Sequence, residues 1–131
     1  MNWDHKDVWT MRSDLFTVTV ERRTVDHDDR RGPHRWNVYA YIYSGHPHFV
    51  RFNGTALDQP ACQEMPFHGG VTLVKYHRGE DTISSIQVGG DYNHEGDERF
   101  TRHATSEKAV EQFGDAEELF NWLLEQETTK N

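Results

Sequence analysis

Four side chains that can bind a metal ion or move a proton occur within residues 67–100. They are His68, Asp91, His94 and Asp97. A carboxylate that accepts a hydrogen bond from a histidine N–H fixes the tautomer of the ring and raises the basicity of its other nitrogen. Such a pair serves as a general base or as the core of a metal site. Two histidines with one or two carboxylates are enough ligands for Zn²⁺, Mn²⁺ or Fe²⁺, with a position left for water.

These residues flank a predicted β-hairpin, in which strands around VTLVKYH and TISSIQV are joined by the turn RGED. With Arg78 opposite Asp81, the register places His68 opposite Asp91. The same register pairs the four glycines across the strands, Gly69 with Gly90 and Gly70 with Gly89. Glycines leave the rim of a sheet without side chains, so a ligand or another backbone can approach closely. A β-bulge would shift this register by one residue.

Three interpretations of the cluster stay open. Asp91, Asn93 and Gly96 are also ordinary turn residues, and a His–Asp hydrogen bond can simply fasten a loop to a sheet. The alternatives are a ligand or partner site without catalysis, and a metal or catalytic site. The chain has no HExxH, CxxC or EF-hand spacing and no P-loop, GxGxxG or GxSxG motif. No residue is therefore assigned a catalytic role, and whether the protein is an enzyme stays open.

The same segment resembles a family of small proteins encoded by bacteriophages and prophages. HGGVT followed by GGDYNHEGD is similar to the H-G-G-x-T … G-x-D-x-x-H-x-G-D signature of that family, over about a quarter of the chain. Two positions depart from the pattern: Leu73 replaces an aromatic residue, and Tyr92 replaces a frequent cysteine. The resemblance implies a phage origin and a shared site, without implying an activity.

The strand signals precede the helix signals along the chain. Strict alternation of apolar and polar residues predicts strands at 15–22 and 35–43. A third strand is predicted before the hairpin, at HFVRFN, residues 48–53. Residues 54–66 have no period and predict a long loop. We therefore expect one α+β domain over residues 1–131, an antiparallel sheet of about five strands with helices on one face.

A C-terminal amphipathic helix is predicted to pack on that sheet. Its apolar stripe follows the i, i+3, i+4, i+7, i+8 rule. Asp115 and Glu118 have the spacing of a capping box at its start. Gly114 is expected to end a short preceding helix over 105–113.

Composition limits the classes of partner. The formal net charge of −8 argues against direct binding to nucleic acid or to an anionic membrane. A single cysteine, Cys62, suits a reducing compartment, and no signal pattern or membrane-spanning apolar run is present. These features predict a cytoplasmic protein of an infected or lysogenic bacterial host.

A stripe of tyrosines is the candidate partner surface. Tyr39, Tyr41 and Tyr43 alternate with the apolar residues of one strand, so they share its other face. Tyrosine is enriched in binding hot spots, so an exposed stripe would be a binding surface. The alternative, equally open, is that the first helix or the N-terminal Trp3 and Trp9 cover the stripe. His46 and His48, around Pro47, are expected to lie in a solvated turn rather than to form a ligand pair.

The sequence leaves hypotheses from different classes. The leading one is a non-enzymatic phage accessory protein that binds a host or phage protein, for example to blunt a defence system. The alternative is a small metal-dependent hydrolase or ligand-binding protein that uses His68, Asp91, His94 and Asp97. A virion component is the third, and no sequence feature speaks for it directly.

Overall fold

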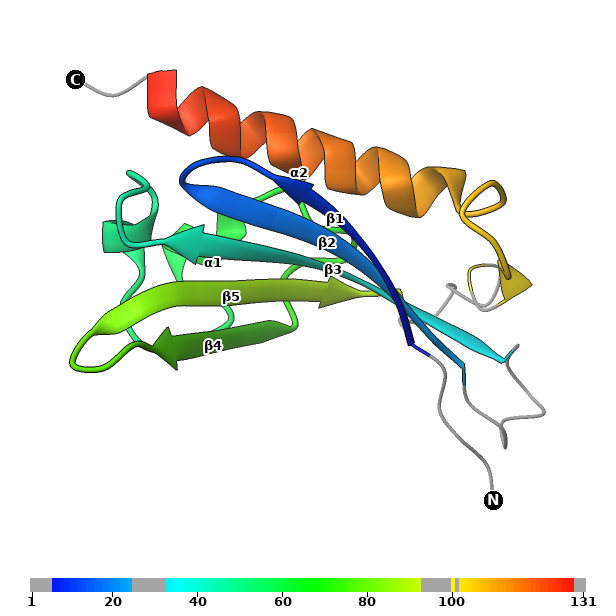
Figure 1. Cartoon of the computed structure of the whole chain (residues 1–131), viewed down its shortest axis with the longest axis horizontal. Coiled ribbons are helices and arrows are strands. Elements are labelled where there is room, and N and C mark those ends of the chain that lie inside the picture. Colours follow the sequence, from blue (N-terminus) through cyan, green and yellow to red (C-terminus); the bar gives the residue numbers. More distant parts are fainter. Residues whose placement is uncertain (1–5, 25–32, 93–99, 101, 129–131) are drawn as a thin grey trace.

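Five strands form one antiparallel sheet, and a long C-terminal helix lies along one of its faces (Figure 1). The computed structural model describes residues 6–24, 33–92, 100 and 102–128. The predicted class, an α+β domain with an antiparallel sheet and an amphipathic terminal helix, is confirmed. The sheet order is β1-β2-β3-β5-β4, with the strands β1 (Lys6–Arg12), β2 (Phe16–Thr24), β3 (His34–Tyr43), β4 (Leu73–Arg78) and β5 (Ile83–Asp91).

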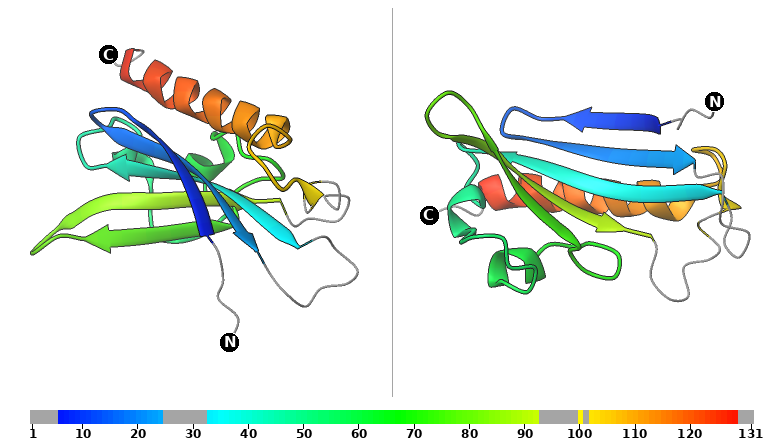
Figure 2. Two further views of the ribbon diagram at one scale, coloured as in Figure 1. Left: turned by 45° about the vertical axis from the view of Figure 1, so that its right-hand side comes forward. Right: turned by 90° about the horizontal axis from the view of Figure 1, so that it is seen from below.

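The core lies between the sheet and helix α2 (Val110–Thr128), because alternate residues of the central strands point to that side. In the right-hand view of Figure 2 the sheet lies in front of α2, so the molecule has two layers. The buried side chains of β2, β3 and α2 that meet there are Phe16, Val18, Val20, Trp36, Val38, Ala40, Ile42, Ala116, Leu119 and Leu123.

The connection between β3 and β4 covers the rest of the same face. It contains a 3₁₀ turn, η1 (Phe49–Arg51), and a single helical turn, α1 (Pro60–Gln63). Ala61, Cys62 and Met65 of this connection are buried in the core. The predicted long loop at 54–66 therefore holds one short helix and supplies core side chains.

Two strand assignments differ from the prediction. Residues 48–53 are not a strand, because residues 49–51 form the 3₁₀ turn and His48 is held in the core. The fifth strand of the sheet is instead β1, which was not predicted from the sequence and which pairs with β2. The number of strands was right, while the membership of one of them was wrong.

The predicted break at Gly114 is also wrong. One helix runs from Val110 to Thr128, and Gly114 lies on its exposed side with open space where a Cβ would be. A solvent-facing glycine costs a helix only about 1 kcal/mol relative to alanine, so it does not end one that tertiary packing stabilises. Asp115 does not cap a helix; its carboxylate accepts a hydrogen bond from the Tyr92 hydroxyl at 2.5 Å.

Within the described residues, no helix has the length and apolar character that a membrane crossing requires.

Candidate functional site

The hairpin register differs from the predicted one by three residues. Leu73 of β4, and not Gly70, lies opposite Gly89 of β5. The turn is narrow, with the Gly79 N–H donating to the Thr82 carbonyl at 2.7 Å, and the ladder is irregular next to it, between His77 and Arg78. The predicted cross-strand pairing of the glycines, and of His68 with Asp91, is therefore wrong.

The first glycine pair lies in a turn that precedes β4. Gly69 and Gly70 have φ values of 68° and 91°, a region that side-chain-bearing residues rarely adopt. This turn still comes close to β5, because a Cβ at Gly90 would lie 3.2 Å from the Gly70 carbonyl oxygen and 2.9 Å from Phe67 Cδ1. Gly90 thus gives the turn room to pack against the sheet.

His68 and Asp91 are directed to different sides of the sheet. The His68 ring stacks on Tyr92, with centroids 4.6 Å apart, and Tyr92 is buried in the core on the α2 side. Asp91 pairs with Asn37 and its charge acts on Tyr39, which places it on the opposite face. The ring of His68 therefore packs in an aromatic cluster that also includes Phe100, at 5.2 Å.

His94 and Asp97 lie outside the described residues, so the four-residue ligand set stays a prediction. In the described part of the chain, no group of three or more His, Cys, Asp or Glu side chains is arranged to hold a metal ion. The site for Zn²⁺, Mn²⁺ or Fe²⁺ accordingly also stays a prediction.

The face of the sheet opposite α2, here called the tyrosine face, carries Tyr39, Tyr41 and Tyr43. Their neighbours across β2 and β5 are small or polar, with Thr17 and Gln87 on either side of Tyr41. No described segment crosses this face in the right-hand view of Figure 2.

The alternative, coverage by a helix or by the N-terminal tryptophans, does not occur within the described residues. α2 packs on the other face, and Trp9 packs there too, against Trp36 and Phe113. Trp3 lies outside the described residues.

The tyrosine rings lie along the sheet instead of standing away from it. The Tyr39 ring lies over Gly89, where an added Cβ would come within 2.4 Å of Tyr39 Cδ1. The Tyr43 hydroxyl forms a 2.6 Å hydrogen bond with Thr17 Oγ1 on the neighbouring strand. The rings therefore shield the polar residues beneath them, and Thr17 and Thr19 are more than nine-tenths buried although nothing described covers that side of the sheet.

Burial under this arrangement changes the acidity of two tyrosines. Burial, with the negative charge of Glu21 second, raises the pKa of Tyr39 to about 12. The same two causes raise the pKa of Tyr41. Both phenols therefore stay neutral hydrogen-bond donors at any physiological pH.

Substitution of Gly89 by alanine is expected to displace the Tyr39 ring, because the new Cβ would overlap it. We expect a loss of about 1–3 kcal/mol in the free energy of unfolding, as for other overpacked sites. In a Tyr39→Ala background the clash is absent, so Gly89→Ala should cost close to nothing there. Urea titrations of the four proteins in this double-mutant cycle measure the coupling, and equal losses in both backgrounds would contradict the geometry.

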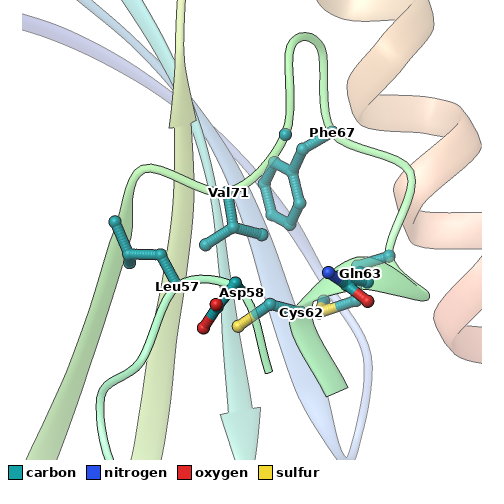
Figure 3. A pocket seen from close by; sticks show the side chains of 8 residues that line it. Leu57, Asp58, Cys62, Gln63, Phe67 and Val71 are labelled. Carbon is teal, nitrogen blue, oxygen red and sulfur yellow. The ribbon is translucent and has the colours of Figure 1, made fainter. Parts of the chain in front are cut away.

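A cavity of about 460 Å³ lies beside the glycine turn, between α1 and the start of β4 (Figure 3). Phe67 and Val71 line it from the glycine turn, and Leu57, Asp58 and Cys62 line it from the segment that includes α1. Burial, and then the charge of Asp58, raises the pKa of the Cys62 thiol. The thiol is therefore protonated at neutral pH and is a poor nucleophile.

His46 and His48 are almost completely buried, each with 1% of its surface exposed, so the predicted solvated turn is wrong. The backbone N–H of His48 donates to His46 Nδ1 at 3.0 Å, which leaves the His46 proton on Nε2. His46 Nε2 then donates to the Leu123 carbonyl at 2.9 Å, and His48 Nε2 donates to the Ala61 carbonyl at 2.8 Å. His46 therefore ties the β3–β4 connection to the last turns of α2, and His48 ties two parts of that connection to each other.

No sequence signal marks these histidines as buried, because polar residues around a proline are typical of exposed turns. The signal that the sequence does carry is the alternation in β3, which separates the tyrosines from the core residues.

Comparisons with protein-family models, with curated proteins and with solved structures found no significant match to this chain.

Proposed function

We propose that this chain is a small accessory protein of a bacteriophage or prophage that acts by binding a host or phage protein through its tyrosine face. Blunting of a bacterial defence system, or redirection of a host process, is the role that fits such a protein. The similarity of its HGGVT … GGDYNHEGD segment to phage-encoded proteins supports the origin.

One observation carries the binding mode: three tyrosines form a row on a sheet face that no described segment covers. Tyrosine supplies a large, rigid contact area at a low cost in side-chain entropy, and it is among the residues most enriched in hot spots. The rings are already held against the sheet by Gly89 and Thr17, so little further order is required on binding. The face is therefore arranged in advance for a flat contact.

A loss of binding in Tyr41→Ala is the expected result, because Tyr41 lies at the centre of the row. Tyr76→Ala is the matched control, since Tyr76 lies on the opposite face and donates to the Gly54 carbonyl. Protein retained from host lysate by the parent and by Tyr76→Ala, and absent with Tyr41→Ala, identifies the partner. Calorimetry with that purified partner should show a loss of affinity of at least about tenfold for Tyr41→Ala, the size of a hot-spot residue.

Equal capture and equal affinity for Tyr41→Ala and the parent would contradict the proposal. A thermal melt of each variant checks that the fold is kept. Tyr41 is half-buried on the outer face and has no core partner among the described residues, so its removal should leave the molecule folded.

A further inference from the structure

Among the described side chains of the tyrosine face, Arg12, Arg23, Arg35 and Lys75 outnumber the two carboxylates, Glu21 and Asp91, whereas the protein as a whole is acidic. The chain has 22 acidic and 14 basic side chains. The row of residues that pairs across the five strands through Tyr41 is Arg12, Thr17, Tyr41, Gln87 and Lys75. Arg12 and Lys75 are exposed, one on each edge strand, and each lies two strands away from Tyr41.

No carboxylate occurs, among the described residues, in the rows through Tyr39, Tyr41 and Tyr43. The acids at this end of the sheet belong to the turns that close the hairpins, namely Asp14, Glu80 and Asp81. On the other side of the molecule, Glu117, Glu118 and Glu125 line a hollow along α2. Two carboxylates among the described residues do share the tyrosine face, Glu21, which is buried, and Asp91, and both lie in the row next to that of Tyr39. The row through Tyr41 has an exposed cation at each edge of the sheet.

From this arrangement we propose that the partner presents an acidic polypeptide segment, with carboxylates on either side of an apolar or aromatic centre that lies on Tyr41. The inference rests on the proposed function and specifies the chemistry of its partner. Adjacent strands are about 4.8 Å apart, so the backbones of Arg12 and Lys75 are about 19 Å apart across four spacings. An extended segment covers that distance in about six residues, and its carboxylates would then meet one cation at each edge.

Two other occupants fit the charges less well. A nucleic acid would need several phosphate contacts, whereas the exposed cations described on this face, Arg12, Arg23 and Lys75, neutralise few phosphates. Long-range repulsion from a protein of net charge −8 also opposes such binding. A second copy of the chain would bring together two faces that each have an excess of cations, and Glu21 and Asp91 lie outside the rows through the three tyrosines.

The test is a selection from a displayed library of random dodecapeptides against three immobilised proteins. These are the parent, the double charge reversal Arg12→Glu/Lys75→Glu, and the matched reversal Arg102→Glu/Lys108→Glu. Arg102 and Lys108 are exposed in the segment that leads into α2. Peptides selected on the parent and on the matched reversal should contain an excess of Asp and Glu over the unselected library, and those selected on the first reversal should not.

A peptide selected on the parent should bind Arg12→Glu/Lys75→Glu at least about tenfold more weakly in fluorescence anisotropy, and the matched reversal within about twofold. Its affinity for the parent should also fall as salt is raised, because the charges at the rim are exposed. Selected peptides without an acidic excess, or an unchanged affinity for Arg12→Glu/Lys75→Glu, would overturn this inference and leave the proposed function standing.

A result that contradicts the proposed function can be told apart from one that contradicts only this inference. In that case no peptide would be enriched on the parent over Tyr41→Ala, and the inference would fall with it. Two further results would also overturn the inference by naming another occupant. One is tight binding of a short single-stranded oligonucleotide that Arg12→Glu/Lys75→Glu abolishes. The other is a dimer of the parent in sedimentation that Tyr41→Ala dissociates.

Discussion

Replacement of His46 by alanine is expected to lower the free energy of unfolding by about 3–4 kcal/mol. The change leaves the Leu123 carbonyl and the His48 N–H without their partners in the core. It also removes a ring that packs edge-on against Phe16, with centroids 5.5 Å apart. Urea denaturation followed by tryptophan fluorescence measures the loss.

Two comparison variants separate these contributions. Asparagine at position 46 can place its side-chain oxygen where Nδ1 lies, so His46→Asn should restore the bond from the His48 N–H and cost less than alanine. His77→Ala, on the tyrosine face, should cost below about 1 kcal/mol, because the ring is half-buried and its partner Gln87 stays partly hydrated. A cost below about 0.5 kcal/mol for His46→Ala is what an exposed turn would give, and it would contradict the buried arrangement.

The second large effect is a loss of stability in mild acid. Burial lowers the pKa of His48 below its ordinary value of 6.5, and the positive charge of Arg51 acts in the same direction. The hydrogen bond to the Ala61 carbonyl and the charge of Glu64 oppose this shift without outweighing it.

The direction of this pH dependence follows from the pH at which the folded and the unfolded chain each bind the proton. The unfolded chain binds the proton near pH 6.5 and the folded chain only at lower pH. The stability that neutral His48 provides is therefore complete above pH 6.5, and it is lost as the pH falls through the folded pKa. Each unit of lowering corresponds to about 1.4 kcal/mol. Unfolding free energies should therefore change little between pH 7.5 and about pH 6.5 and then decrease toward pH 5.

His48→Gln identifies the residue responsible. A glutamine amide can replace the Nε2 donor to Ala61 without binding a proton, so the decrease between pH 6.5 and pH 5 should be smaller than in the parent. His77→Gln is the control for the chemical change itself, because His77 lies on the other face of the sheet from His48. Equal slopes for the parent and His48→Gln would assign the acid sensitivity to other groups.

The sequence predicted those parts of the fold that depend on the periodicity of apolar residues. Strict alternation in β2 and β3 assigned every core position correctly and placed the tyrosines on the other face. The apolar stripe of α2 identified the buried Ala116, Leu119 and Leu123, although Leu124, also part of the predicted stripe, is exposed and Gly114 was taken for a helix end. β1 was missed because its short alternation, with Trp9 and Met11 inward, lies in a segment rich in polar residues.

The parts that could not be predicted depend on tertiary contacts. The hairpin register is set by the narrow turn at residues 79–82 and the irregularity at His77, and neither has a unique sequence signal. The burial of His46 and His48 depends on carbonyl groups of Leu123 and Ala61, 77 and 13 residues away in sequence. For Gly89, the sequence predicted a close approach, while the group that approaches is the Tyr39 ring of β3.

The strand order has a consequence for folding during synthesis. β3 pairs with β5 and not with β4, so the strand that carries the tyrosines keeps one unpaired edge until residue 91 has left the ribosome. A chain folded only as far as β3 would be a three-stranded meander with a hydrophobic face and an open edge, features that promote aggregation and chaperone binding. Gly89 moves under Tyr39 only when β5 docks. A partner that requires the ordered tyrosine row would therefore bind only chains whose sheet is complete.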